Sequence, residues 1–496
     1  MDDDRKIRVR YAPSPTGRLH VGGVRTALFN WLFARKNGGT FVLRIEDTDL
    51  ERSTEESVEQ LEGSMRWIGL NWDEGPEIGG PHPPYRQTER FDLYREAAQK
   101  LIDSGAAYYD FATPEELAEL REQARAEKRQ PIYTGGEYRG MDPDEARNRI
   151  EAGESYTVRF KTPREGQTVV EDMIRGPVTF ENANLEDFVL MKSTDTPTYN
   201  FAAAYDDAEM EISHVIRGDD HLSNTPRQIL IHEALGNPLP AFAHVPQVLG
   251  PDKKKLSKRH GAASVEDFAE RGYLPEALFN YLALLGAGYA ADEEIFTPEE
   301  LAERFRIDRV SGNPAILDEK KLRAVNAVYL RRKSPEELAD LAAPMLIEAG
   351  VVTEEELDMP RLREIMDLLR ERIAVTTEIP DSVGYFYGGT LDYEEAEFEK
   401  QFGKEFGKEF VRENFPELVE RLTALPEWTE GAIEEAIRGL AAEKEKGARH
   451  LIHPLRFAVT GRTVSAGLFE TMQLIGRERS LLRAGDAAEK MQRLAV

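Results

Sequence analysis

The fold is decided by the stretch Ile7-Arg-Val-Arg-Tyr-Ala-Pro-Ser-Pro-Thr-Gly-Arg-Leu-His-Val-Gly-Gly23 and the segments that follow it. Residues 7–12 alternate as a strand does, and a loop rich in proline and glycine comes next. Apolar residues recur at helical spacing over 24–36, Asn37-Gly-Gly39 ends that helix, and residues 41–46 form a second strand. Strand, glycine loop, helix and strand make a βαβ unit, which predicts a parallel sheet.

The bulk composition indicates a large soluble protein. The chain has 496 residues, enough for three or four domains at roughly 100–200 residues each, and 41% are hydrophobic against 31% charged. No apolar run approaches the roughly 20 residues that a membrane span needs. The acidic start Met1-Asp-Asp-Asp4 lacks the basic and apolar regions of a secretory signal. We therefore expect a cytoplasmic protein without membrane contact.

Cysteine is absent, which excludes disulfides, thiolate metal sites and cysteine nucleophiles. The nine histidines show no metal-binding spacing. The net charge is −27 and the pI about 4.9, which taken alone argues against binding nucleic acid. In a large multidomain chain, however, a local basic track can bind RNA, and we interpret the excess acid as a solubility or salt adaptation.

The pattern changes along the chain. We expect helices at 54–68, 90–104 and 225–235, a capping box at Thr113–Glu116, and short strands at 156–161, 168–173, 176–180 and 188–192. Residues 199–217 read as strand and loop. After residue 261 the pattern becomes nearly all helical, with segments punctuated by Pro344, Pro360, Pro380, Pro416 and Pro454. The predicted fold class is α/β, with an α+β insertion and a helical C-terminal region.

The first loop suits a phosphate. Between a strand and a helix, its backbone N–H groups lie beside a positive helix end, and glycines allow close approach of a ligand. His20 can donate to a phosphate oxygen. A tight turn with an incidental histidine is the plainer interpretation of Gly22-Gly23 alone. The longer pattern Ala12-Pro-Ser-Pro-Thr-Gly-x-Leu-His-Val-Gly-Gly23, however, resembles the HIGH signature of class I aminoacyl-tRNA synthetases in its glutamyl form, which has glycine at the fourth position.

A second signature follows about 230 residues later. Lys253-Lys-Lys-Leu-Ser-Lys-Arg-His-Gly261 would usually be a solvated basic loop. Its core, Lys255-Leu-Ser-Lys-Arg259, resembles the KMSKS signature, and the flanking Gly250-Pro-Asp252 also fits the glutamyl family. Two weak motifs in the right order and context make a strong one. The resemblance covers residues 1–330 strongly and the helical third more weakly, through His453–Arg462 and Gly467–Glu470.

The resemblance implies a Rossmann-type catalytic domain that activates L-glutamate with ATP and transfers it to the 3′ end of tRNA(Glu). The glutamate carboxylate attacks the α-phosphorus and expels pyrophosphate, a reaction helped mainly by positioning and fixed positive charge. Mg²⁺ should accompany the nucleotide. The catalytic residues implied are Thr16, His20, Lys255 and Lys258.

Two residue sets follow from the resemblance. ATP is expected to contact Pro13, Ser14, Pro15, Thr16, Gly17, His20, Gly22, Gly23, Lys255, Leu256, Ser257, Lys258 and Arg259. Glutamate is expected to contact Arg10, Ala12, Ser14, Glu46, Tyr199, Arg217 and Asp220. Arginine forks suit the two substrate carboxylates, and Glu46 suits the ammonium group. Ion pairing of Arg217 with Asp219 or Asp220 is the structural alternative.

Some glutamyl enzymes carry a zinc site in the insertion. The matching stretches here, 108–113 and 133–139, contain neither Cys nor His, so we expect no zinc. The domains are expected at 1–85 with 200–240 (catalytic), 86–199 (acceptor-stem insertion), 241–333 (stem contact, with the second signature) and 334–496 (anticodon binding). In the last region Arg370, Arg372 and Arg456 are candidates to face RNA. We expect a monomer.

Three other functions compete with this one. A short relative that glutamylates a modified tRNA base lacks the helical third and the intact second signature, both of which are present here. A glutaminyl enzyme fits the Val-Gly-Gly and Lys-Leu-Ser-Lys-Arg forms less well, whereas a glutamyl enzyme that also charges tRNA(Gln) stays an alternative. A non-catalytic tRNA-binding paralogue would be expected to have lost His20 or Lys258, and this chain keeps both.

Overall fold

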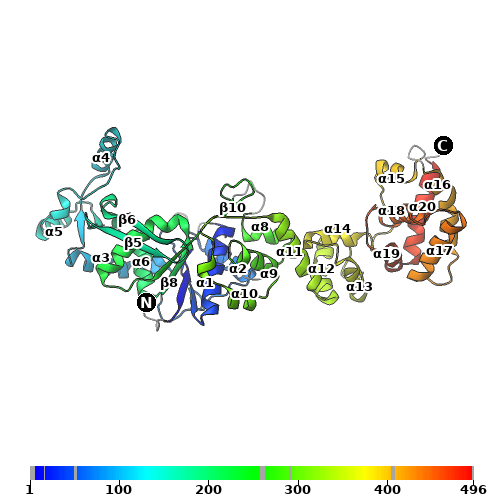
Figure 1. Ribbon diagram of the computed structural model, residues 1–496, viewed down its shortest axis with the longest axis horizontal. Helices are drawn as coiled ribbons and strands as arrows, with labels where there is room; N and C mark the ends of the chain where they lie inside the picture. Colours follow the sequence, from blue (N-terminus) through cyan, green and yellow to red (C-terminus); the bar gives the residue numbers. More distant parts are fainter. Residues whose placement is uncertain are drawn as a thin grey trace. The chain divides into compact units, whose positions relative to one another are not determined.

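The computed structural model describes residues 6–15, 17–49, 53–256, 263–289, 293–403 and 408–493. The chain divides into two compact units, each with its own core. The first unit comprises residues 1–270 and 275–322, and the second comprises 271–274 and 323–496. In Figure 1 the first unit runs from blue to green and the second from yellow-green to red.

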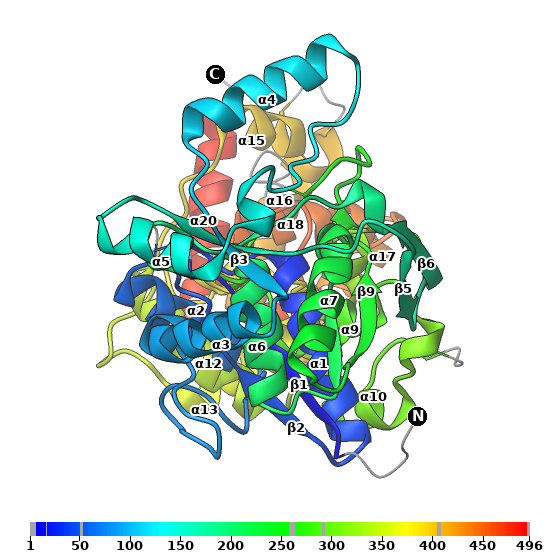
Figure 2. The same cartoon turned by 90° about the vertical axis from the view of Figure 1, so that its left-hand side faces the viewer.

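A six-stranded sheet organises the first unit. Its strands, in spatial order, are β2 (Thr40–Leu43), β1 (Arg8–Tyr11), β8 (His214–Gly218), β9 (Ala241–Val245), β5 (Gln167–Asp172) and β6 (Gly176–Glu181). Every pairing is parallel except that of β5 with β6, which form an antiparallel hairpin at one edge of the sheet (Figure 2). The parallel sheet that the βαβ pattern predicted is therefore present.

Helix α1 (Val21–Lys36) makes the crossover from β1 to β2. It begins three residues before the expected Val24, because His20 caps it by accepting a hydrogen bond from the Gly22 N–H. Arg35 and Lys36 lie in its last turn, where positive side chains favour the negative helix end. Ten of its sixteen residues are buried, so the helix that carries the first signature is fixed on several sides.

Helix α6 (Tyr199–Glu209) corrects the expectation of strand and loop over 199–217. Residues 201–207 are all buried, so this helix has no polar face and no amphipathic period. Its first residues, Tyr-Asn-Phe, also have low intrinsic helix propensity. The helical state is set by packing within the fold and was not visible in the local pattern.

The segment 86–199 holds a separate antiparallel sheet of β3 (Ala107–Asp110), β4 (Thr157–Phe160) and β7 (Val189–Met191). Its helices are α3 (Phe91–Asp103), α4 (Pro114–Ala126) and α5 (Pro143–Glu151). The capping box expected at the start of α4 is formed by Thr113 and Glu116. The hairpin of β5 and β6 also lies in this chain segment, yet it extends the main parallel sheet.

Side-chain hydrogen bonds join the stretches 108–113 and 133–139. Tyr133 donates to Asp110 at 2.7 Å, and Arg159 donates to the other oxygen of the same carboxylate at 2.5 Å. Tyr108 and Arg139 both donate to the fully buried Asp187 at 3.0 and 3.1 Å. Hydrogen bonds between side chains therefore connect these parts of the insertion.

The rest of the first unit is mostly helical. Its remaining elements are α2 (Glu55–Trp67), η4 (Asp219–Asn224), α7 (Thr225–Leu235), β10 (Val248–Leu249), α8 (Val265–Glu270), α9 (Pro275–Leu284), α10 (Pro298–Arg304) and β11 (Ala315–Ile316), with short 3₁₀ turns at 87–90, 138–140, 182–184 and 307–309. Strands β10 and β11 pair in parallel outside the main sheet. Helix α11 (Glu319–Arg332) begins at the end of this unit.

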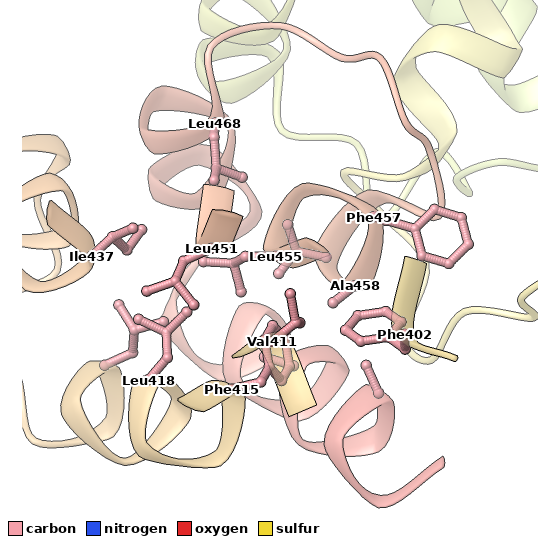
Figure 3. Close-up of a cluster of buried hydrophobic side chains, with 14 of the residues drawn as sticks. Phe402, Val411, Phe415, Leu418, Ile437, Leu451, Leu455, Phe457, Ala458 and Leu468 are labelled. Atoms are coloured by element: carbon pink, nitrogen blue, oxygen red, sulfur yellow. The ribbon is translucent and has the colours of Figure 1, made fainter. Parts of the chain in front are cut away.

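The described part of the second unit contains only helices and 3₁₀ turns. Its helices after α11 are α12 (Pro335–Glu348), α13 (Met359–Leu369), α14 (Ile379–Gly384), α15 (Glu395–Phe402), α16 (Glu409–Thr423), α17 (Glu430–Glu443), α18 (Arg449–Thr460), α19 (Leu468–Ile475) and α20 (Arg477–Arg493). Residues such as Phe402, Phe415, Leu451 and Leu455 meet in one apolar cluster (Figure 3). This confirms the helical C-terminal region.

Three prolines correct the expected helix breaks. Pro344, Pro416 and Pro454 lie inside α12, α16 and α18, whereas Pro360 and Pro380 lie at the first turns of α13 and α14. Proline inside a helix removes one hydrogen bond, but burial of an apolar helix face can outweigh that loss. Among the described residues, no helix has both the length and the apolar character to cross a membrane.

Candidate active site

A cavity of about 600 Å³ opens at the carboxyl ends of β1, β8 and β9. From β1 the chain moves outward to β2, whereas β8 and β9 lie on the other side of β1, so the strand order reverses here. Open parallel sheets bind ligands at such switch points. The cavity is lined by Arg10, Tyr11, Ala12, Pro13, Ser14, His20, Gly22, Gly23, Thr26, Glu46, Thr48, Tyr199, Ile216, Arg217, Gly218, Asp220, His221, Val245, Pro246, Gln247, Val248 and Lys255.

The cavity brings together most residues that the sequence indicated, including every expected glutamate contact. Pro15, Gly17 and Leu256 are described but do not line it. Thr16, Ser257, Lys258 and Arg259 lie outside the described residues. Outside the two expected residue sets, the cavity is also lined by Tyr11, Thr26, Thr48, Ile216, Gly218, His221, Val245, Pro246, Gln247 and Val248. Val245 ends β9, and Pro246, Gln247 and Val248 follow it, so the run Ala241-Phe-Ala-His-Val245 could have been recognised as a strand ending at the site.

His20 joins the two signatures. Its Nδ1 accepts from the Gly22 N–H at 3.4 Å, and its Nε2 lies 3.0 Å from the Leu256 carbonyl oxygen, so Nε2 carries the proton. Burial lowers the pKa of His20, and the nearby Lys255 adds to this effect, so the ring is neutral near pH 7. Backbone bonds from Val21 to Ala263 and from Val265 to Leu19 reinforce the connection.

Two glycines of the first signature are constrained, Gly17 by its backbone conformation and Gly23 by a neighbouring side chain. Gly17 has a φ of +132°, which side-chain-bearing residues rarely adopt. A Cβ on Gly23 would lie 2.7 Å from the Tyr11 hydroxyl, so even alanine would collide there. The loop thus reaches the start of α1 closely packed, with Gly22, Gly23 and Thr26 exposed to the cavity at the positive helix end.

Arg10 and Arg44 share one acid. Asp207 accepts from Arg10 Nε at 2.9 Å and from Arg44 Nη1 at 2.8 Å, and Arg44 also donates to Glu46 at 3.0 Å. Burial opposes the charge of Asp207, but the two guanidinium groups outweigh it and hold the pKa of that carboxyl well below its usual range. Burial outweighs the attraction of Arg44 at Glu46 and raises its pKa. Arg10 therefore reaches the cavity already paired with an acid that it shares with Arg44.

Arg217 is held differently. It is 5% exposed and donates to His244 Nε2 at 3.2 Å, to the Tyr199 hydroxyl at 3.5 Å and to the Thr225 hydroxyl at 2.8 Å. Within the described residues it forms no ion pair, and Asp219 pairs instead with Arg175 at 2.5 Å. Burial lowers the pKa of Arg217, and burial with the nearby Arg217 charge lowers the pKa of His221 to about 4.

Known protein families match both units. The model of class I tRNA synthetases for glutamate and glutamine (E and Q), catalytic domain, matches residues 6–324, and an anticodon-binding domain model matches residues 337–488. With the switch-point cavity and the two signatures, this defines the class: a class I aminoacyl-tRNA synthetase of the glutamate and glutamine group.

Individual relatives narrow the assignment. The chain is 77% identical to glutamate–tRNA ligase 2 of Rubrobacter xylanophilus over 99% of both chains. It is 49% identical to the glutamate–tRNA ligase of Moorella thermoacetica, over 97% of this chain and 98% of that one. A crystal structure of a glutamate–tRNA ligase from Elizabethkingia meningosepticum in complex with its amino acid aligns with a TM-score of 0.89 at 33% identity, covering 98% and 100% of the chains. The chain belongs to the glutamate–tRNA ligase family.

Proposed function

We propose that this chain activates L-glutamate with ATP and transfers it to the 3′ end of tRNA(Glu), as a glutamate–tRNA ligase working in the cytoplasm as a monomer. The observation that carries the proposal is the buried Arg217 at the cavity, which forms no ion pair among the described residues. A buried cation without an acid strongly favours the binding of a ligand that supplies one, because a buried charge without a partner is costly.

The cavity offers one group for each charge of glutamate. Arg217 and Arg10 present guanidinium groups to the two carboxylates, and Arg10 Nη1 has no partner in the part of the chain that the structure describes. Glu46 has one oxygen bound to Arg44, which leaves the other for the ammonium group. Glutamine would leave a guanidinium facing a neutral amide, and a buried charge without its partner is costly. This supports rejection of glutamine.

ATP is proposed to occupy the side of the cavity near the start of α1. Gly22, Gly23 and the helix N-terminus suit its phosphates. Lys255 and Lys258 are proposed to stabilise the negative charge of the departing pyrophosphate. Mg²⁺ is proposed to arrive on those phosphates, since it binds through one or two carboxylates plus substrate oxygens. The side chain of Leu256 is buried, and its backbone carbonyl oxygen is hydrogen-bonded to His20. We therefore infer that Leu256 acts near the site through this carbonyl group.

We propose that the transfer step places a terminal ribose hydroxyl of tRNA against the glutamyl adenylate, so that AMP leaves as the ester forms. Positioning of the two reacting groups supplies most of the rate. The segments 86–199 and 241–333 are proposed to contact the acceptor stem, and 334–496 the anticodon. Of the candidate arginines, Arg456 already donates to Ser465 at 2.6 Å, and Arg370 pairs with Asp367 at 3.4 Å.

The test is glutamate-dependent exchange of pyrophosphate into ATP, with and without tRNA, and with glutamine in parallel. Exchange with glutamate and none with glutamine supports the proposal. Exchange with glutamine would favour a glutaminyl enzyme, charging of tRNA(Gln) with glutamate would favour a non-discriminating one, and no exchange in a folded sample given tRNA would favour a non-catalytic paralogue. Lys258→Ala should lower exchange at least tenfold, because one charge-stabilising group contributes roughly 2.7–4 kcal/mol.

A further inference from the structure

A chain of buried polar groups lies behind Arg217. Asp172 is the last residue of β5, His244 lies on β9 and Arg217 on β8, so three strands of the main sheet contribute one residue each. Asp172 and His244 are 5% and 0% exposed. Neither lines the cavity, and the proposed chemistry uses neither of them. Their hydrogen bonds nevertheless lead directly to the cation that faces the ligand.

Asp172 fixes which ring nitrogen of His244 carries the proton. Its Oδ2 accepts from the backbone N–H of His244 at 2.9 Å and from His244 Nδ1 at 2.6 Å. Its Oδ1 accepts from the backbone N–H groups of Ile174 and Arg175 at 3.0 and 2.8 Å. With four N–H donors the carboxylate is saturated and immobile. Because Nδ1 must donate to it, Nε2 of the neutral ring is left as an acceptor.

The acceptor on His244 faces the guanidinium group. Nε2 lies 3.2 Å from Arg217 Nε and 3.0 Å from the Thr225 hydroxyl, and that hydroxyl accepts from Arg217 Nη2 at 2.8 Å. Two neutral acceptors thus hold the rear edge of the guanidinium group, while Nη1 has only the long contact with Tyr199 among the residues that the structure describes. The charged groups around the ring are Asp172, Arg175 and Arg217, and the titratable His221 also interacts with it.

We propose that Asp172 and His244 are positioning residues for the amino-acid substrate: they aim Arg217 at a substrate carboxylate without neutralising it at the cavity. This inference rests on the proposed function. The contrast with Arg10 supports it, because Arg10 is bound directly and twice by the carboxylate of Asp207. Arg217 is connected to its supporting acid, Asp172, only through the imidazole of His244. The side of the guanidinium group that faces the cavity is therefore left for a substrate carboxylate.

The experiment compares His244→Ala and His244→Gln in charging of tRNA with glutamate, using KM for glutamate and for ATP. His244→Ala removes the acceptor, and the KM for glutamate should rise about tenfold, the worth of one hydrogen bond to a charged group. The KM for ATP should stay within about twofold. His244→Gln places an amide oxygen near the Nε2 position and should recover most of the loss.

His232 provides a matched control, since it is a buried histidine of the same unit, 2% exposed, and lies outside the cavity. His232→Gln should leave both KM values unchanged. If His244→Ala does not fold, the test compares the glutamate KM of His244→Gln with that of Asp172→Asn. Asparagine cannot accept from all four N–H groups, so this variant should raise the KM for glutamate while His244→Gln stays near wild type.

The inference is overturned by an unchanged KM for glutamate in folded His244→Ala, by an equal rise in the KM for ATP, or by His244→Gln performing no better than His244→Ala. If His244→Ala does not fold, Asp172→Asn with an unchanged glutamate KM overturns it as well. Failure of the proposed function has a different signature, because wild-type protein would then charge no tRNA with glutamate. Melting temperatures measured on each variant separate loss of substrate binding from loss of the fold.

Discussion

The two units each bury an arginine that has no carboxylate partner within the described residues, Arg217 in the first and Arg483 in the second. Burial lowers the pKa of both. Arg483 is fully buried, and its donors are taken up by backbone carbonyl oxygens. Nε donates to Gly389 at 2.7 Å, Nη1 to Tyr385 and Val459 at 2.7 Å each, and Nη2 to Gly388.

The difference lies in what remains of each guanidinium group. The carbonyls around Arg483 include those of Tyr385, just after α14, and Val459, in the last turn of α18, which are groups that a helix leaves unpaired. Arg483 is therefore a structural residue, with four of its five N–H donors bonded to backbone carbonyl oxygens. Arg217 keeps free donor capacity and faces a cavity. A buried cation without an acid thus indicates a binding site only where its donors are unfilled and a ligand can reach them.

Replacing Arg217 should have the largest effect on activity. Arg217→Gln removes the charge that meets a substrate carboxylate, a loss of about 2–5 kcal/mol, so kcat/KM for glutamate should fall by about 30-fold or more. Charging kinetics with saturating ATP measure this, and selectivity against glutamine should fall with it. If kcat/KM is unchanged in a folded variant, Arg217 is structural, as Arg483 is.

Arg483→Met should act on stability alone. Four buried carbonyl oxygens lose their donor, and unsatisfied buried groups cost about 1–3 kcal/mol each before the helices relax, so the second unit should lose about 2–4 kcal/mol. Denaturant unfolding of the intact chain gives this loss as a shift of the second unit's transition. Arg493→Met, at an exposed position of the same helix, serves as the control. A large rise in the glutamate KM without loss of stability would contradict the comparison.

His221 should give the smallest effect, a dependence of stability on pH. Its folded pKa of about 4 lies below the unfolded value of about 6.5, so the unfolded chain binds more protons. The stability that comes from neutral His221 is present above pH 6.5 and is lost as the pH falls toward 4. Between pH 7 and pH 5, His221→Asn should lose about 2 kcal/mol less than wild type in unfolding of the first unit. An identical pH slope in both proteins would show that His221 titrates normally.

Much of this site could be predicted from the sequence because the two signatures are local strings with a chemical requirement. Arg10, Glu46, Tyr199 and Arg217 all line one cavity, as expected. Their supports could not be predicted, since Asp207 contacts Arg10 across 197 positions and meets it only through the packing of α6 against the sheet.

The helices also divide into those that the sequence predicted and those that it did not. Helix α7 was expected at 225–235 and is found there, because Gly236 in the left-handed region ends it and Pro226 lies in its first turn. Helix α6 was missed because it is buried on nearly all sides. The interior prolines were misjudged because apolar packing, as around Phe415 and Leu455, outweighs one missing hydrogen bond. The part of the second signature from Ser257 to Arg259 lies outside the described residues.

The hairpin of β5 and β6 makes the protein less modular than its chain order indicates. An engineer who exchanged the insertion between two relatives would cut near residues 86 and 199, and would carry Asp172 away with it. Strand β5, which pairs with β9, and the edge strand β6 would leave at the same time. A chimera that preserves the amino-acid pocket therefore has to keep residues 167–181 with the recipient sheet, so that the exchangeable cassette consists of two separate pieces of chain.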